Sequence, residues 1–219
     1  MMGNSAAAKK KVRKELQLHL VDLGFLELIE LSGRLRAHFE AFVVAHASLL
    51  QGRVLVSFVP FESEPQIQVE SESQDEPYRV AYVRVDDWER REMSVREARR
   101  DLPGQWEEWR IPGGNRIYQP VDSRPEISSA DIGVILVPGL GFTREGGRLG
   151  RGAGFYDRLL ERHPSALRVG IAFSRQVRGE LPEDEHDQRM DMLLTDDGMF
   201  TMNCYGEWKK QGKIISRAV

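Results

Sequence analysis

The feature that most constrains the fold of this chain is a glycine-rich segment between an apolar run and a helical pattern. Gly133–Val137 is a continuous apolar run, typical of a central parallel strand that is covered on both faces. The glycine-rich residues follow within Val137–Leu160, and a helix is predicted from about Gly154 to Arg162. Arg168–Phe173 is a second buried strand. Strand, loop, helix and strand at this spacing predict a βαβ unit and an α/β fold.

The rest of the chain predicts helices at the start and further strands in both halves. The expected elements are a helix from Lys9 with Val12, Leu16, Leu20 and Leu23 on one face, a helix over Leu26–Ser48, strands over Arg53–Val59, Val80–Val85 and Met192–Thr195, a charged surface helix over Asp86–Asp101, an irregular stretch from Pro103 to Pro125, and a solvated loop or exposed helix over Gln66–Glu76. Residues 1–8 are expected to be disordered. Residues 9–219 are expected to form one domain, because neither a repeat nor a long linker interrupts them.

Composition and charge favour a globular domain and argue against several other classes of protein. Apolar residues make up 41% of the 219 positions and charged residues 30%, as in a globular domain. Lys and Arg number 31 against 34 Asp and Glu, and the net charge of −3 argues against a nucleic-acid-binding surface over the whole chain. The single Cys204 excludes an intrachain disulfide. No apolar run approaches the roughly 18 residues of a membrane span.

These properties set an expectation for location and partners. The basic start of the chain lacks the apolar centre of a secretory signal, which favours the cytoplasm, and an organelle presequence is the alternative. We expect a monomer or homodimer that acts on a small molecule and binds neither nucleic acid nor a membrane.

The glycine-rich segment has the chemistry of an anion site. Three glycines alternate just before the predicted helix, at Gly150, Gly152 and Gly154. Glycine lets backbone N–H groups converge on an anion, and a helix N-terminus adds partial positive charge. Arg148 and Arg151 add forked cations, whereas Asp157 suits a phosphate site only if Mg²⁺ bridges the two. The spacing matches neither the P-loop nor the Rossmann fingerprint, and for the glycines alone a structural turn is the alternative.

Three other segments carry candidate side chains. Lys9–Lys14 is basic and forms either a phosphate clamp or a solvated helix start. Glu64, in the turn after a predicted strand, is either a hydrogen-bond acceptor for a ligand or an exposed carboxylate. The acidic loop Glu183–Asp191 is either solvated or supplies Asp187 or Asp191 as a Mg²⁺ ligand, because hard carboxylate oxygens suit that ion.

Together these motifs resemble a known signature. The segments Pro138–Phe142 (PGLGF) and Arg148–Asp157 (RLGRGAGFYD) resemble those of the 5-formyltetrahydrofolate cyclo-ligase family, whose activity is also called 5,10-methenyltetrahydrofolate synthetase. Further matches follow in order at Lys9 with Arg13, at Ser57–Pro65, at Gln119-Pro120, and at Ala172-Phe173 with Gln176, Pro182, His186, Asp187, Asp191 and Thr195. The resemblance covers about Lys9–Asp196 and is strong after Asp131.

The family resemblance implies a fold and a reaction. The fold would be a single three-layer α/β domain with a mainly parallel sheet, resembling the sugar-isomerase and CoA-transferase class. ATP, with Mg²⁺, would phosphorylate the formyl oxygen of 5-formyltetrahydrofolate to give an iminium phosphate. N10 of the folate would then attack, and phosphate would leave as the methenyl bridge closes. For such a reaction the protein must position the substrates and neutralise their charge, and it needs no covalent nucleophile.

The resemblance also implies roles for single residues. ATP would be bound by Lys9, Arg13, Arg148, Gly150, Arg151, Gly152, Gly154 and Tyr156. The substrate would be bound by Val59, Glu64 and Phe155, with Phe155 or Tyr156 packing against the pterin. Mg²⁺ would be held by Asp157 and Asp187. Phe155 departs from the usual aromatic pair by lacking a hydroxyl, and Ala153 replaces a Gly or Lys of relatives.

Two other hypotheses belong to different classes. The first is a non-catalytic or repurposed relative that binds a nucleotide or folate as a regulatory module. The second is an RNA-binding protein that uses Lys9–Lys14 and the arginines of the 144–151 loop, with Trp106 and Trp109 as stacking platforms. The negative net charge argues against the RNA-binding hypothesis.

Overall fold

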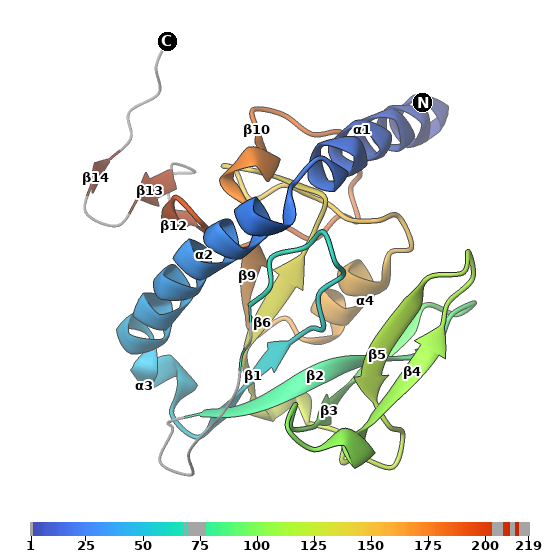
Figure 1. Cartoon of the computed structure of the whole chain (residues 1–219), viewed down its shortest axis with the longest axis vertical. Coiled ribbons are helices and arrows are strands. Elements are labelled where there is room, and N and C mark those ends of the chain that lie inside the picture. The colour runs from blue at the N-terminus through green and yellow to red at the C-terminus, as the bar shows by residue number, and fades with distance from the viewer. Residues whose placement is uncertain (1, 68, 70–77, 203–207, 211–212, 215–219) are drawn as a thin grey trace.

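A large mixed sheet forms the centre of the protein in the computed structural model, which describes residues 2–67, 69, 78–202, 208–210 and 213–214. The strands of this sheet are β1 (Arg53–Ser57), β2 (Tyr78–Asp87), β3 (Glu92–Glu97), β6 (Ile132–Pro138), β9 (Leu167–Ile171), β11 (Met192–Thr195), β12 (Gly198–Met202), β13 (Trp208–Lys210) and β14 (Lys213–Ile214). Their order is β14-β13-β12-β11-β9-β6-β1-β2-β3 (Figure 1). Strands β2, β1, β6, β9 and β11 pair in parallel, and the outer pairs are antiparallel. The prediction of an α/β fold with a mainly parallel sheet is confirmed.

Apolar side chains lie on both faces of this sheet. One cluster joins Leu55 and Leu136 of the sheet to Phe42 of helix α2 (Phe25–Ala45). A second cluster joins Val56 of the sheet to Leu159 of helix α4 (Phe155–Arg162). Because side chains alternate along a strand, the two helices cover opposite faces. Strands β6 and β9 pair in parallel with α4 between them in the chain, so the predicted βαβ unit is confirmed.

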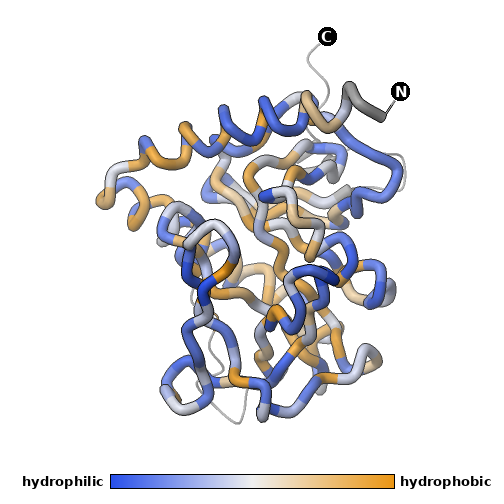
Figure 2. Tube along the Cα trace, turned by 90° about the vertical axis from the view of Figure 1, so that its right-hand side faces the viewer, coloured by the Kyte–Doolittle hydropathy of each residue, from blue (hydrophilic) through white to orange (hydrophobic). Residues whose placement is uncertain are grey.

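The first helix extends further toward the N-terminus than the sequence predicts. Helix α1 spans Met2–Val21, whereas residues 1–8 are expected to be disordered. The run Ala6–Ala8 has the highest intrinsic helix propensity, which accounts for the extension. The α1 trace, which begins at the N label in Figure 2, alternates between hydrophilic and hydrophobic residues. Its buried positions Leu16 and Leu20 pack with Phe173 in a third apolar cluster.

The predicted helix over Leu26–Ser48 is confirmed in its main part. Helix α2 runs through Gly33 without interruption, and the short α3 (Ala47–Leu50) follows it. None of the helices in the described part of the chain has the length and apolar character that a bilayer crossing demands. Most of the predicted loop over Gln66–Glu76, together with Cys204, lies outside the described residues.

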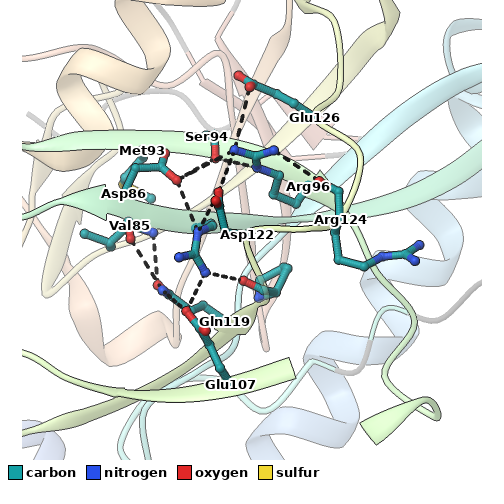
Figure 3. A network of polar contacts seen from close by, with 12 residues as sticks. Val85, Asp86, Met93, Ser94, Arg96, Glu107, Gln119, Asp122, Arg124 and Glu126 are labelled. Carbon is teal, nitrogen blue, oxygen red and sulfur yellow. Dashed lines mark hydrogen bonds and ion pairs between the residues drawn. The ribbon is translucent and has the colours of Figure 1, made fainter. Parts of the chain in front are cut away.

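The prediction of a surface helix over Asp86–Asp101 is wrong, because β3 lies there and pairs antiparallel with β2. Met93 and Val95 of β3 are buried in the apolar cluster beneath α4. The charged residues pair across neighbouring strands instead of covering a helix. Arg96 Nη2 lies 3.2 Å from Asp122 Oδ1 and 4.0 Å from Asp86 Oδ1, within the polar network of Figure 3.

The prediction of an irregular stretch from Pro103 to Pro125 is also wrong in part. Strands β4 (Trp106–Arg110) and β5 (Arg116–Pro120) form an antiparallel hairpin there. Gly113 and Gly114 turn its tip with φ angles of 98° and 89°, which glycine adopts without strain. The remaining elements are η1 (Pro103–Gln105), η2 (Ser129–Asp131), η3 (Ser174–Gln176), and a small sheet of β7 (Gly141–Thr143), β8 (Arg148–Leu149) and β10 (Val177–Arg178).

Candidate functional site

A cavity of about 640 Å³ lies among α1, the glycine-rich segment and the β4–β5 hairpin. Every residue to which the family resemblance gives a binding role lines it: Lys9, Arg13, Val59, Glu64, Arg148, Gly150, Arg151, Gly152, Gly154, Phe155, Tyr156, Asp157 and Asp187. Asp191, the alternative to Asp187, is not among the lining residues and accepts a hydrogen bond from the Arg168 N–H instead. The structure thus brings together residues that are far apart in sequence, while their individual roles stay predictions.

The glycine-rich loop lets two guanidinium groups lie directly against the backbone. Gly152 and Gly154 have φ angles of 105° and 75°, a region that other residues rarely adopt. A β-carbon at Gly150 would lie 2.7 Å from Nη1 of Arg148, and one at Gly152 would lie 3.1 Å from Cζ of Arg13. Arg13 Nε also donates a hydrogen bond to the Gly150 carbonyl over 3.0 Å. Gly150 and Gly152 therefore leave room for the approach of these two cations.

Arg148 is a buried cation, and one of its three guanidinium nitrogens has no hydrogen-bond partner in the described part of the chain. Its Nη2 donates to Asp157 Oδ1 over 2.7 Å, and its Nη1 donates to the Pro138 carbonyl over 3.3 Å. Its Nε is buried and has no hydrogen-bond partner among the described residues. An unsatisfied buried donor is costly and uncommon in folded proteins. Because other atoms of Arg148 line the cavity, its positive charge would suit an anion there.

Glu64 is a buried carboxylate that meets the glycine-rich loop. Its Oε1 accepts hydrogen bonds from Nε and Nη2 of Arg151 over 3.0 and 2.8 Å. Its Oε2 accepts from the Phe61 N–H, and the Arg151 guanidinium lies 4.4 Å from the centre of the Phe61 ring. Burial, together with the Glu64 charge, raises the pKa of Tyr156 far above its ordinary value, so that phenol stays protonated.

Helix α1 is joined to the acidic loop by a buried lysine. Lys9 Nζ donates to Asp184 Oδ2 over 2.7 Å and also to Asp187 Oδ2. Burial by itself lowers the pKa of Lys9, but hydrogen bonds to the two carboxylates outweigh it and leave the pKa raised. The same lysine lowers the pKa of Asp184 through its hydrogen bond. Lys9 therefore stays charged and Asp184 stays ionised at neutral pH.

The carboxylates of the cavity fit a magnesium ion that is shared with phosphates. No group of three or more His, Cys, Asp or Glu side chains in the described ranges could hold a metal ion unaided. Mg²⁺ commonly takes one or two protein carboxylates and completes its shell with phosphate oxygens and water. Asp157 and Asp187 both line the cavity, and the Gln188 N–H lies 3.4 Å from Asp157 Oδ1, which joins α4 to the acidic loop.

Several residues of the cavity are missed by the sequence prediction. Trp88 packs against Phe155 with ring centres 5.0 Å apart, and the Arg91 backbone has a φ of 58°, uncommon for a residue other than glycine. The hairpin adds Ile117 and Tyr118. They are missed because the turn after β2 and the hairpin fall in segments predicted as a helix and as irregular chain. The Gly113-Gly114 turn is a signal that could have indicated the hairpin, and with it Ile117 and Tyr118.

The tryptophans proposed as stacking platforms are used within the fold. The Trp106 ring meets Tyr82 edge-on at 4.9 Å, and its Nε1 donates to the Arg99 carbonyl. The Trp109 ring lies 6.4 Å from that of Trp88. These contacts give both rings a packing role.

Curated proteins and solved structures resemble this chain. The 5-formyltetrahydrofolate cyclo-ligase of Mus musculus is 39% identical over 89 residues, which are 37% of this chain and 44% of the relative. That of Mycolicibacterium smegmatis is 42% identical over 103 residues, 43% of this chain and 52% of the relative. The chain thus spans about half the length of the curated relatives it matches.

Two solved structures share the fold across nearly their whole length. The 5,10-methenyltetrahydrofolate synthetase of Mycoplasma pneumoniae has a TM-score of 0.65 at 20% identity, with 86% of this chain and 98% of that chain covered. The NMR structure of the Aquifex aeolicus synthetase has a TM-score of 0.68 at 24% identity, with 96% of each chain covered. The model of the 5-formyltetrahydrofolate cyclo-ligase family matches residues 7–196, and with most of its length matched the chain belongs to that family.

Proposed function

We propose that this protein converts 5-formyltetrahydrofolate to 5,10-methenyltetrahydrofolate in a reaction that requires ATP and Mg²⁺. The observation that carries the proposal is one cavity that Lys9, Arg13 and Arg148 line together with the glycine-rich loop. The membership of the family and the cyclo-ligase names of its relatives support the same activity.

The cations and glycines of the cavity would hold the phosphates of ATP. Arg148, Arg13 and Lys9 would neutralise the phosphate charge. The N–H groups of Gly150, Gly152 and Gly154 would face the same phosphates at the start of α4, and Tyr156 would close the site with its neutral ring. Such preorganised charge lowers the barrier to phosphoryl transfer mainly through electrostatics.

The folate would lie between Glu64 and the aromatic residues. The buried Glu64 carboxylate would accept hydrogen bonds from pterin N–H groups, while Val59 and Phe155 would pack against the ring. Arg151, which is paired with Glu64, would lie at the junction of the two substrates. The loss of the formyl oxygen needs its phosphorylation, because an amide oxygen is otherwise a poor leaving group.

Mg²⁺ would be held by Asp157 and Asp187, and it would supply charge neutralisation for the phosphates. Asp157 pairs with Arg148, and Asp187 pairs with Lys9. A bound phosphate would draw the two cations toward itself and leave the carboxylate oxygens to the metal. The arrangement thus links the binding of nucleotide to the formation of the metal site.

We infer the finer fold class on similar grounds. Apolar clusters on both faces of the sheet support a three-layer domain of the sugar-isomerase and CoA-transferase class. The cytoplasmic location and the state of monomer or homodimer stay predictions from the sequence.

The decisive experiment is a methenyl-formation assay on the purified protein. Ultraviolet absorbance of the methenyl product should rise only when 5-formyltetrahydrofolate, ATP and Mg²⁺ are all present. Omission of each component in turn is the control. Thermal stabilisation by ATP without turnover would favour the regulatory module over the enzyme.

A further inference from the structure

The β4–β5 hairpin forms one wall of the cavity, and its contribution differs in kind from that of the glycine-rich loop. Its lining residues are Ile111, Ile117, Tyr118 and Gln119. Strand β2 lies beside it and adds Val83 and Val85. None of these residues, within the described chain, carries a charge. This wall therefore suits the ring system of a ligand, whereas the cations of the cavity come from other elements.

Gln119 is the buried side chain that fastens this wall to the central sheet. Only 2% of Gln119 is exposed. Its Oε1 accepts a hydrogen bond from the Val85 N–H over 3.0 Å, and its Nε2 donates to the Val85 carbonyl over 3.4 Å. The amide thus binds both backbone groups of one β2 residue (Figure 3).

This contact lies where β2 extends beyond the end of its neighbouring strand β1. Strand β1 pairs with β2 only from Tyr78 to Tyr82, so the N–H and carbonyl of Val85 lie beyond the end of β1. The Gln119 amide takes the place of the missing strand there. Because unpaired backbone groups of a buried strand are costly, the contact holds the hairpin at one defined position on β2.

Charged residues reinforce the same contact. Gln119 Nε2 also donates to Glu107 Oε1 over 3.1 Å, across the hairpin. Arg84 Nη1 donates to Glu107 Oε1 over 2.5 Å and to the Pro120 carbonyl over 2.6 Å. Burial alone would raise the pKa of Glu107, but its hydrogen bonds to Arg84 and Gln119 outweigh this and lower it. Glu107 therefore stays ionised and accepts from both partners at neutral pH.

From these contacts we propose that Gln119 is a positioning residue that fixes the hairpin wall and thereby sets the affinity for the folate, but not for ATP. The inference rests on the proposed function, because it assigns this wall to the folate ring system. Gln119 acts through the position of Ile117 and Tyr118, its hairpin neighbours, rather than through chemistry at the reacting atoms.

The test compares Gln119→Ala with Gln105→Ala, a matched glutamine at the base of the same hairpin. Gln105 Oε1 accepts a hydrogen bond from the Arg99 N–H over 2.8 Å, and Gln105 is not a cavity-lining residue. Gln119→Ala should raise KM for 5-formyltetrahydrofolate by about tenfold, the effect of one lost hydrogen-bonded anchor, and leave KM for ATP within about twofold. Gln105→Ala should change neither constant. Equal folate KM values in the two variants, or equal rises for both substrates, would overturn the proposal.

A second variant gives a signature that loss of stability alone would not produce. In Gln119→Glu, the ionised Glu107 raises the pKa of the new carboxyl, whereas Arg84, which pairs with Glu107, lowers it. In its protonated form the new side chain can donate to Glu107 and accept from Val85, as the amide does. KM for folate should therefore be near that of the wild type at low pH and rise as pH increases through that pKa, whereas the wild type shows no such step. A pH-independent KM in Gln119→Glu would count against the positioning role.

Two readouts without turnover separate this inference from the proposed function. Amide hydrogen exchange in residues 106–120 should be faster in Gln119→Ala than in Gln105→Ala, whether or not substrate is present. Folate binding to the wild type should quench the fluorescence of Trp88, which lines the cavity. Folate binding without methenyl formation would refute the proposed enzymatic activity. The role of Gln119 would then be tested by comparing the folate affinities of Gln119→Ala and Gln105→Ala. Absence of folate binding in the wild type would refute both.

Discussion

Nη2 of Arg148 lies 2.7 Å from Oδ1 of Asp157, so the buried cation of the glycine-rich loop is neutralised by the first turn of α4. The cation and the carboxylate lie side by side in the cavity, which is also lined by other positively and negatively charged side chains. Polyanionic phosphate with a divalent cation has the complementary arrangement of charge. If ATP and Mg²⁺ bind as proposed, the pair would separate toward them without leaving either charge buried and alone.

Asp157→Asn should remove the Mg²⁺-dependent reaction while the protein stays folded. The amide keeps the shape of the side chain but is a poor ligand for a hard cation. We expect kcat to fall by about 100-fold or more in the methenyl assay, with the Mg²⁺ dependence shifted to higher concentration. Asp191→Asn is the control, because Asp191 lies outside the cavity lining and holds only the Arg168 N–H. If Asp157→Asn were as active as the control, Asp157 would not be a Mg²⁺ ligand.

Glu64→Gln should weaken folate binding more than ATP binding. The substitution removes the charge that pairs with Arg151 and that would accept from the pterin, while it keeps the volume. KM for the folate should rise about tenfold, as for a lost charge-assisted hydrogen bond. It should also reduce the rise in the pKa of Tyr156, to which the Glu64 charge contributes.

The control for this prediction is the neighbouring Glu62→Gln. Glu62 is exposed and is not a cavity-lining residue. Steady-state kinetics of the two variants at one pH give the comparison. A folate KM that is unchanged in both variants would argue against contact between Glu64 and the pterin.

Gly152→Ala should damage the site and the stability together, whereas Gly33→Ala should be harmless. At Gly152 the φ angle of 105° is strained for alanine, and the new β-carbon would lie 3.1 Å from Arg13 Cζ. We expect a loss of about 1–3 kcal/mol in the free energy of unfolding and a higher KM for ATP. Gly33 lies within α2 with no atom within 4 Å of a β-carbon, so alanine there should add about 0.5–1 kcal/mol. Urea unfolding measures both values.

The contact of α1 with the acidic loop should depend on pH in two windows. The raised pKa of Lys9 gives stability that is present below its ordinary value of 10.5 and is lost as pH rises through the higher folded value. The lowered pKa of Asp184 gives stability that is present above 3.8 and is lost as pH falls through the lower folded value. Lys9 should therefore stabilise the protein throughout the range between these values.

Thermal unfolding of Lys9→Met and of the wild type measures this contribution. The difference in Tm should be constant near neutral pH and should shrink as the medium becomes acidic enough to protonate Asp184. Lys10→Met is the control, because Lys10 is exposed on the same helix. A Tm difference that persists unchanged into strong acid would contradict the assignment to Asp184 and Asp187.

The sequence predicts best those elements whose apolar pattern is continuous. Strand β6 and helix α4 follow from the run at Gly133–Val137 and from the glycines ahead of the helix, because burial on both faces leaves no room for polar residues. Strand β3 is mistaken for a helix because Arg96 and its neighbours pair with carboxylates across the sheet. A charged strand edge and a charged helix surface have similar composition.

The sequence indicates many of the residues that line the cavity but not their geometry. The resemblance indicates both Glu64 and Arg151, yet they lie 87 positions apart and their hydrogen bond depends on the fold. Asp184 is missed because nothing in the sequence distinguishes it from its acidic neighbours, whereas the structure pairs it with Lys9. The wall that Tyr118 helps to form is missed because its hairpin is not recognised.

The contact between Lys9 and Asp187 spans 178 positions, and this has a consequence for biosynthesis. Ribosomes add about 5–20 residues each second, so the lysine waits roughly 10–40 s for the aspartate to be translated. During that interval Leu16 and Leu20 also lack Phe173, the core residue against which they pack. The apolar face of α1 thus stays without its Phe173 partner until that residue has been translated, long after the helix itself has been made.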